Sequence, residues 1–265
     1  MLRARAAFAG IAVLWVFAAA CGAPQRASDA RTRETIRVLA FNIHHGEGMD
    51  ERLDLERIAR LISDVNPDLV AIQEVDRGVE RTGDVDQAAV LAELTGLTAL
   101  FGKFMEYQGG HYGMALLSRW PIVRSRNHLL PEGPEPRSAL TARVRSPTTG
   151  REIVFVGIHF YRTPEERWSQ ASRVIEIFAA EETPVILAGD FNSQPDSEVI
   201  RGLAEVWTIP GKGADRLTFP SYAPEREIDF IMYRPAERFE VIRQEVLDEP
   251  IASDHRPVLL ELAVF

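Results

Sequence analysis

Pro184-Val185-Ile186-Leu187-Ala188-Gly189-Asp190-Phe191-Asn192 is the stretch from which the fold of this chain is best predicted. A short apolar run between a proline and a glycine is typical of a buried strand. Because side chains alternate along a strand, Asp190 and Asn192 point to the same face just beyond its end. A carboxylate beside a carboxamide can orient a water molecule and hydrogen-bond an anion. The commoner role of such a pair is an Asx turn that closes the strand.

Other apolar strands also end in polar residues. Three further strands are predicted, and each ends in a polar side chain: Ile36–Asn42, Asp68–Glu74 and Ile153–His159. Helical spacing of apolar residues predicts a helix over 53–65, ended by Asn66-Pro67, between the first two strands. Strands separated by helices gather their ends at one sheet edge, so we expect Asn42, Glu74, His159 and Asp190 to meet there.

The rest of the chain adds three candidates beside predicted strands and two loops. Asp229 begins a predicted strand over 228–233, and Asp254 and His255 precede the last strand, 258–264. Three prolines between 131 and 136 indicate an irregular loop, which delivers Arg137 to the start of the next strand. The glycines within 108–111 favour a mobile loop.

A shared sheet edge would crowd many polar groups together. Taken singly, Asn42 could cap a turn, Glu74 could be a surface carboxylate and His159 could be a hydrogen-bonded core residue. Taken together, clustered carboxylates repel one another, and a divalent metal ion relieves that repulsion. The oxygen donors Glu74, Asn42 and Asp254 favour Mg²⁺ or Mn²⁺ over Zn²⁺, and such a cation suits phosphate chemistry.

An acid–base function is predicted for the last motif. Asp254 and His255 place a carboxylate and an imidazole together, and Asp229 can hold the imidazole in one tautomer. His255 is then either a general base or the partner of Asp190 in activating water.

The ordered motifs FN at 41, QE at 73, H at 159, GDFN at 189, ID at 228 and SDH at 253 resemble the endonuclease/exonuclease/phosphatase superfamily. That superfamily includes deoxyribonucleases, abasic-site endonucleases, inositol polyphosphate phosphatases and bacterial sphingomyelinases. The resemblance spans about Ile36–Phe265. It implies an α/β fold, a four-layer α-β-β-α sandwich of two packed mixed β-sheets, and hydrolysis of a phosphoester by in-line attack of water.

The resemblance also implies a role for each residue. The metal ion would be held by Glu74, with Asn42 and Asp254. The remaining roles are shared among five residues: Asp190 orients the attacking water, Asn192 and His159 hold phosphate oxygens, and Asp229 pairs with His255.

Longer segments resemble one bacterial branch of the superfamily, similar to eukaryotic proteins linked to remodelling of glycosylphosphatidylinositol lipids. They are NIHHG at 42, QEVDRGVERTGDVDQ at 73, YQGGHYGMALLSRWPI at 107, PRSAL at 136 and TFPS at 218. Arg137 is a candidate phosphate clamp, and the alternative is a surface salt bridge. Two departures from the branch, Met114 and Phe160-Tyr161-Arg162, are expected near the substrate and leave specificity open.

Residues 1–20 are predicted to be an export signal, because two arginines precede an apolar stretch that ends in small residues. Cys21, the only cysteine, follows directly, as in bacterial lipoprotein signals, where this cysteine is acylated and becomes the mature N-terminus. The alternative is an ordinary secretory signal with an incidental cysteine. Residues 21–35 are then the lipidated cysteine and a tether, and 36–265 the catalytic domain.

The expected protein is a bacterial lipoprotein of the cell envelope, anchored in a membrane by its N-terminal lipid, facing the periplasm or the exterior, and monomeric. A formal net charge of −9 disfavours an extended nucleic-acid surface. The function we expect is metal-dependent hydrolysis of a phosphodiester, either a lipid headgroup or a small molecule. Two alternatives stay open: an envelope or secreted nuclease, which needs a local basic groove, and a catalytically silent binding lipoprotein.

Overall fold

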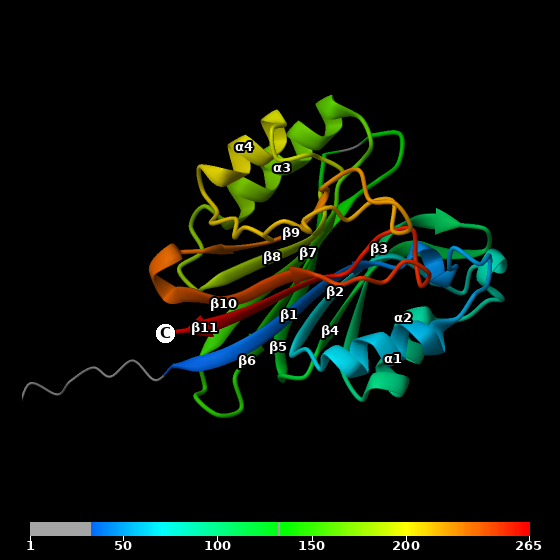
Figure 1. Ribbon diagram of the computed structural model, residues 1–265, viewed down its shortest axis with the longest axis horizontal. Helices are drawn as coiled ribbons and strands as arrows, with labels where there is room; N and C mark the ends of the chain where they lie inside the picture. Colours follow the sequence, from blue (N-terminus) through cyan, green and yellow to red (C-terminus); the bar gives the residue numbers. More distant parts are fainter. Residues whose placement is uncertain (1–32, 132) are drawn as a thin grey trace, which may run out of the picture. The chain divides into compact units, whose positions relative to one another are not determined.

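The computed structural model describes residues 33–131 and 133–265, which contain two mixed β-sheets. The first sheet has six strands in the order β10-β11-β1-β2-β4-β3 (Figure 1). Its strands are β1 (Glu34–Asn42), β2 (Leu69–Arg77), β3 (Thr98–Tyr107), β4 (Gly110–Ser118), β10 (Phe239–Val246) and β11 (Val258–Val264). Only β1 and β2 are parallel neighbours; the other pairs are antiparallel.

The second sheet has five strands in the order β5-β6-β7-β8-β9. They are β5 (Ile122–Leu129), β6 (Ser138–Arg145), β7 (Glu152–His159), β8 (Val185–Asp190) and β9 (Asp229–Arg234). Here β7 and β8 are the parallel pair. The helices are α1 (Leu55–Val65), α2 (Gln87–Thr95), α3 (Pro164–Phe178) and α4 (Glu198–Ala204), with 3-10 turns η1 (His44–Gly46), η2 (Glu80–Thr82) and η3 (Ala236–Arg238).

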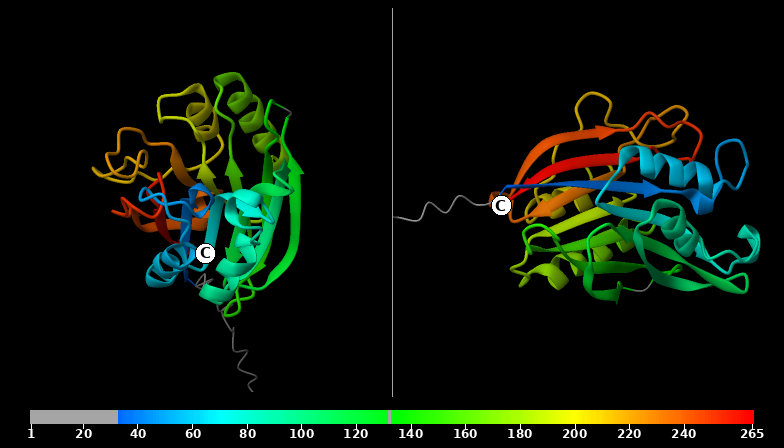
Figure 2. Two further views of the ribbon diagram at one scale, coloured as in Figure 1. Left: turned by 90° about the vertical axis from the view of Figure 1, so that its right-hand side faces the viewer. Right: turned by 90° about the horizontal axis from the view of Figure 1, so that it is seen from below.

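The two sheets pack face to face, with α1 and α2 outside the first sheet and α3 and α4 outside the second (Figures 1 and 2). Three buried apolar clusters fill the spaces between these four layers. β8 is apolar on both faces because both faces are covered. Ile186 lies in the cluster between the sheets, and Leu187 lies in the cluster under α3 and α4. The predicted four-layer sandwich of two mixed sheets is therefore confirmed.

Several local predictions differ from the structure. Glu34 and Thr35, assigned to the tether, are the first residues of β1. Of the predicted loop 108–111, only Gln108 and Gly109 form the turn that joins β3 to β4, because Gly110 and His111 already belong to β4 and Gly110 pairs with Tyr107. Met114 does not lie near a substrate site: it is fully buried between the sheets, where it packs against Gly157. β4 directs this side chain into the core, so Met114 is a packing residue.

The predicted export signal, 1–20, and Cys21 lie outside the described residues. Within 33–131 and 133–265, no helix combines the length and the apolar composition needed to span a membrane.

Candidate active site

Strand ends from both sheets meet at one end of the sandwich, the end that faces the viewer on the left of Figure 2. In the second sheet, His159, Asp190 and Asp229 are directly opposite one another across β7, β8 and β9. In the first sheet, Asn42 ends β1 and lies opposite Gln73 of β2. The predicted position at a strand end is thus correct for Asn42, His159 and Asp190, whereas Glu74 lies within β2, which continues to Arg77.

Two backbone features place the carboxylates. Glu74 lies at a bulge in the pairing of β2 with β4 and has a φ of 58°, a conformation that is costly for a residue with a side chain. Gly189 has a φ of 148°, and a Cβ there would lie 2.0 Å from the carbonyl oxygen of Ile158. Glycine before Asp190 is therefore required for β7 and β8 to approach this closely.

Asp190 is the centre of the hydrogen-bond network. Its Oδ2 accepts a hydrogen bond from Asn42 Nδ2 at 3.3 Å and lies 3.5 Å from His159 Nε2 and 3.7 Å from His255 Nε2. Its Oδ1 accepts one from the backbone N–H of Asn192 at 2.7 Å, the Asx arrangement that the sequence suggested. Burial, and then the nearby Asp229, raise the pKa of Asp190 to about 7.

His255 and Asp229 form a buried pair. Nδ1 of His255 lies 2.9 Å from Asp229 Oδ2, so this nitrogen carries the proton that is donated. Burial alone would lower the pKa of His255, but Asp229 and Asp190 outweigh it and raise the pKa to about 10. The imidazole is therefore cationic at neutral pH, which favours His255 as the partner of Asp190 over His255 as a general base.

His159 and Asn192 present hydrogen-bonding groups to the same space. Burial, followed by the charges of Arg137 and His255, holds the pKa of His159 well below its usual range, so its ring is neutral. His159 Nδ1 is buried and has no hydrogen-bond partner among the described residues. Asn192, with a φ of 49°, donates from Nδ2 to the Phe160 carbonyl oxygen at 2.9 Å, which leaves its second amide proton for another acceptor.

The donor set fits a divalent cation. The carboxylates of Glu74, Asp190 and Asp254 line one pocket, and Asp229 contacts His255, which also lines it. One ligand atom each from Asp190, Asp229 and His255 lies within 4.8 Å of the others. A bound cation would offset the repulsion that raises the pKa of Asp190, and oxygen donors suit a hard metal ion.

The predicted metal-binding residues are near one another. Asn42 donates from Nδ2 to Glu74 Oε1 at 3.0 Å, and its Oδ1 accepts from the backbone N–H of His44 at 3.1 Å. In this arrangement Asn42 positions the Glu74 carboxylate through its amide nitrogen. Glu74 and Asp254 both line the pocket.

The pocket has a volume of about 710 Å³ and a cationic wall. Arg137 is only 4% exposed, forms an ion pair with Glu135 and lies against the rings of three aromatic residues, Phe104, Tyr112 and Tyr161. Its Nε has no hydrogen-bond partner among the described residues. The ion pair that the sequence suggested is therefore present, but it is buried in the pocket wall and not at the surface.

Of the rest of this wall, only Arg162 was expected near the substrate from the sequence. Besides Arg137, four arginines line the pocket: Arg81, Arg162, Arg167 and Arg226. Arg81 is fixed by two hydrogen bonds, of 2.7 and 2.9 Å, to the fully buried Asp76. Both residues lie within the QEVDRGVERTGDVDQ segment, and that resemblance was the only sequence signal for them. Arg162, one of the departures from the branch, does line the pocket, as expected.

The charge pair at His255 gives a pH prediction. Asp229→Asn removes the strongest influence that raises the pKa of His255, and the pKa of His255 should therefore fall below about 10. The stability that protonated His255 gives the folded protein should then be lost at a lower pH than in wild type. An NMR titration of the imidazole in metal-free protein measures this. Asp254→Asn is the control and should give a smaller decrease, because Asp254 ranks last among the groups that raise the pKa of His255. Equal decreases in both variants would contradict the assignment.

Comparisons with known proteins support the resemblance seen in the sequence. A sequence model of the Endonuclease/Exonuclease/phosphatase family matches residues 39–255. The chain is 28% identical to the uncharacterized protein YbhP of Escherichia coli (strain K12) over 250 residues, which cover 88% of this chain and 98% of that protein.

Two solved structures have a similar fold. An endonuclease/exonuclease/phosphatase from Beutenbergia cavernae DSM 12333 has a TM-score of 0.69 and 25% identity, covering 88% of this chain and 72% of that one. A mannosyl-6-phosphatase of Bacteroides thetaiotaomicron VPI-5482 has a TM-score of 0.70 and 21% identity, covering 87% of this chain and 100% of that one. The family match spans most of the chain and contains every residue of the hydrogen-bond network. The chain belongs to the endonuclease/exonuclease/phosphatase family and is a phosphoester hydrolase.

Proposed function

We propose that this hydrolase is a divalent-metal-dependent phosphodiesterase that acts on a lipid headgroup or another small phosphodiester at the cell envelope. The observation that carries the proposal is the pocket of about 710 Å³, which is lined by five arginines together with Glu74, Asp190 and Asp254. Its volume lies within the range of sites for small molecules. Five arginines gathered in one pocket, in a chain of net charge −9, suit a compact anion better than a nucleic-acid strand.

The proton transfer falls to Asp190. Its raised pKa leaves it able to accept a proton from water near neutral pH, and the Asn192 N–H and Asn42 amide fix its orientation. The cationic His255, held by Asp229, places positive charge beside Asp190 and the negative charge that develops on phosphorus-bound oxygens. This division of roles uses two raised pKa values in the site: Asp190 becomes a better proton acceptor, and His255 stays protonated.

The phosphate group is held by neutral and cationic donors. His159 and Asn192 can donate to its oxygens, and Arg137 supplies a guanidinium already oriented by Glu135. A divalent cation held by Glu74, with Asn42 and Asp254 beside it, would polarise a phosphoryl oxygen and neutralise charge on the leaving group.

Arg137 should contribute strongly to substrate binding. Arg137→Ala is expected to lower kcat/KM by about 10- to 100-fold, because a hydrogen bond to a charged group contributes roughly 1.5–3 kcal/mol. Arg137→Lys should restore only part of the loss, since an ammonium lacks the planar fork. Steady-state kinetics on a chromogenic phosphodiester measure both, with the 45%-exposed Arg119, changed to Ala, as the control. A kcat/KM within twofold of wild type in the Arg137→Ala variant would show that Arg137 only supports the pocket wall.

The substrate class is tested by comparing kcat/KM for three classes of substrate. The full chain is incubated with Mg²⁺ or Mn²⁺ and mixed phospholipid micelles, single-stranded DNA, or p-nitrophenyl phosphate, and the products are quantified. Release of a phosphorylated or free headgroup at the highest kcat/KM supports the proposal. Preferred cleavage of DNA would establish the nuclease, and preferred cleavage of the monoester would establish a phosphatase.

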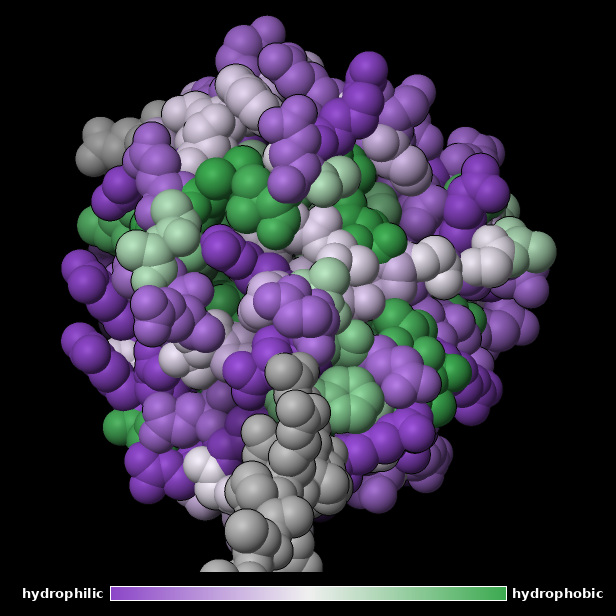
Figure 3. All heavy atoms as spheres, turned by 90° about the vertical axis from the view of Figure 1, so that its left-hand side faces the viewer, coloured by the Kyte–Doolittle hydropathy of each residue, from purple (hydrophilic) through white to green (hydrophobic). Residues whose placement is uncertain are grey.

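Attachment to the envelope is also a proposal, which rests on Cys21 and the export signal. β1 begins at the end of the sheets opposite the pocket, where Glu34 pairs with Val264. On that face of the described residues, hydrophobic side chains lie in separate groups among hydrophilic ones (Figure 3). Labelled palmitate should enter the wild-type protein in a bacterial host and not the Cys21→Ser variant. Equal labelling of both would exclude acylation of Cys21.

A further inference from the structure

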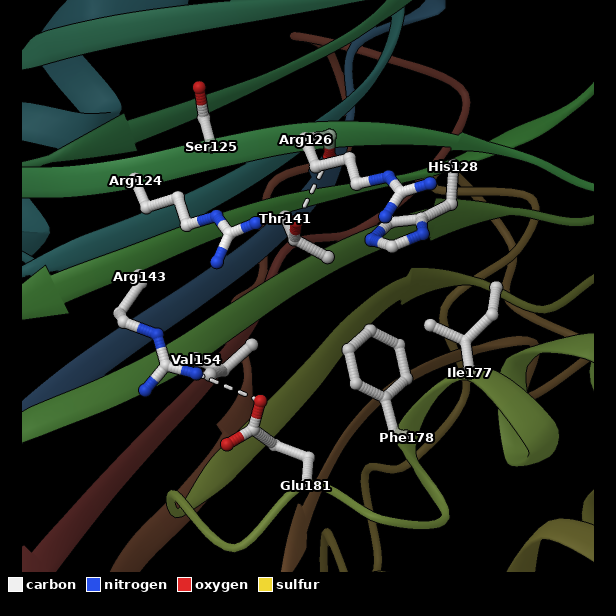
Figure 4. A pocket seen from close by; sticks show the side chains of 10 residues that line it. All are labelled: Arg124, Ser125, Arg126, His128, Thr141, Arg143, Val154, Ile177, Phe178 and Glu181. Carbon is white, nitrogen blue, oxygen red and sulfur yellow. Dashed lines mark hydrogen bonds and ion pairs between the residues drawn. The ribbon is translucent and has the colours of Figure 1, made fainter.

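A second pocket lies on the outer face of the five-stranded sheet (Figure 4). It has a volume of about 150 Å³ and shares no lining residue with the catalytic pocket. One side is formed by β5, the edge strand, and by β6. The other side is formed by the end of α3, with Phe178, and by Glu181 just beyond it. The helix α3 thus leaves this part of the sheet uncovered.

Arginines are crowded on this face. Arg124 lies directly opposite Arg143 in the pairing of β5 with β6, and Arg126 follows two residues later on the same side of β5. Like charges directly opposite each other across two strands are destabilising. The crowding therefore costs stability unless negative charge offsets it.

Only part of this positive charge is offset within the protein. Arg143 donates to Glu181 Oε2 at 2.8 Å and to the Thr183 hydroxyl at 2.6 Å, and also contacts Glu152 at 3.4 Å. In the part of the chain that the structure describes, neither Arg124 nor Arg126 has a carboxylate partner. Two exposed guanidinium groups at the pocket therefore lack a negative partner there.

His128 also lines this pocket. Its ring lies 6.1 Å from that of Phe178, in an edge-to-face arrangement. Burial, followed by the charges of Arg126 and Arg173, lowers the pKa of His128. The imidazole is therefore neutral at physiological pH and can serve as a hydrogen-bonding group without adding charge.

We propose that Arg124, Arg126 and Arg143 form a second binding site, for a phosphate group, on the face opposite the sheet interface and separate from the catalytic pocket. Guanidinium groups match the spacing of phosphate oxygens, and a doubly charged phosphate would balance the two guanidinium groups that lack partners. A water molecule needs about 10–15 Å³ of such space, so about 150 Å³ accommodates a tetrahedral anion. The phosphate group belongs either to a free anion or to a phospholipid headgroup, and the experiment separates these sources.

The first arm measures inorganic phosphate bound to the full-length protein by equilibrium dialysis. The variant is Arg124→Ser with Arg126→Ser, both at exposed positions of an edge strand. The control, Arg52→Ser with Arg60→Ser, removes the same charge from exposed positions next to and within α1. We expect the pocket variant to bind one phosphate fewer than wild type, or to bind it at least tenfold more weakly, and the control to match wild type.

This difference does not depend on the catalytic proposal. If the catalytic pocket also binds phosphate, the expected stoichiometries are two for wild type and one for the pocket variant; if it does not, they are one and zero. Hydrolysis of a chromogenic phosphoester should be unchanged in the pocket variant, because Arg124 and Arg126 lie outside the catalytic pocket. Equal phosphate binding by wild type and the pocket variant would overturn the proposal.

The second arm uses sedimentation with vesicles of phosphatidylcholine containing phosphatidic acid. Wild type and both variants carry the same N-terminal segment, so a difference in sedimentation between the pocket variant and the control is due to the substitutions at the pocket. Weaker sedimentation of the pocket variant than of the control assigns the site to phospholipid headgroups. Loss of phosphate binding with unchanged sedimentation assigns it to free phosphate.

Discussion

Replacing Asp190 by asparagine is expected to lower kcat by about 10²- to 10⁴-fold, the range that a positioned general base contributes. Asparagine keeps the shape of the side chain and can still accept the hydrogen bond from the Asn192 N–H, but it cannot accept a proton from water. KM should change little, because Asp190 acts on the attacking water and not on the bound phosphate. Steady-state kinetics with bis(p-nitrophenyl) phosphate at saturating metal measure both constants.

The pH dependence follows from the same residue. In the protein without metal, the pKa of Asp190 is raised to about 7. A bound cation should lower this pKa, so kcat at saturating metal should rise with pH through a transition below pH 7. Asp196→Asn, at an exposed position, is the matched control and should keep wild-type kinetics. A kcat within threefold of wild type in the Asp190→Asn variant would remove Asp190 from the proton transfer.

Replacing Glu74 by glutamine should raise the metal concentration for half-maximal activity by about 100-fold or more. Loss of an outer partner of a metal ligand alone costs about 10- to 100-fold, and Glu74 is proposed as a direct ligand. Glutamine can still accept the 3.0 Å hydrogen bond from Asn42, so the pocket should keep its shape.

The measurement for Glu74 is activity as a function of Mg²⁺ or Mn²⁺ concentration, together with calorimetric titration of the metal. Glu56→Gln is the control, because its side chain is 77% exposed on α1. An unchanged metal requirement in the Glu74→Gln variant would place the cation elsewhere, with the Asp190, Asp229 and His255 cluster as the remaining candidate.

The central strands and the polar residues at their ends were predictable because both follow from local patterns. The strand β8 is apolar on both faces, so its residues could only lie between two packed layers. Asn42, His159 and Asp190 each stand at the last position of such a strand. Because each residue ends a strand, its position in the sequence was enough to predict that all three share one edge of the fold.

Other features depend on tertiary structure and leave little trace in the sequence. The edge strands β3 and β5 were not predicted, since edge positions are half exposed and show no clear alternation. The bulge at Glu74 arises from pairing with β4, which the residues around Glu74 do not reveal. The protonation of His255 depends on its burial between Asp229 and Asp190. The cationic wall around Arg137 is assembled from separate segments, including η2 with Arg81 and α3 with Arg167.

The central claim is that one metal-dependent site hydrolyses a phosphodiester. Its most direct test is the hydrolysis of bis(p-nitrophenyl) phosphate by the full chain after treatment with EDTA, followed by addition of Mg²⁺ or Mn²⁺, with His255→Ala measured beside it. The account predicts turnover that EDTA abolishes, that either cation restores, and that the His255→Ala variant lacks. Turnover that persists in EDTA, or that is equal in wild type and the variant, or that is absent with both cations from folded protein, would contradict it.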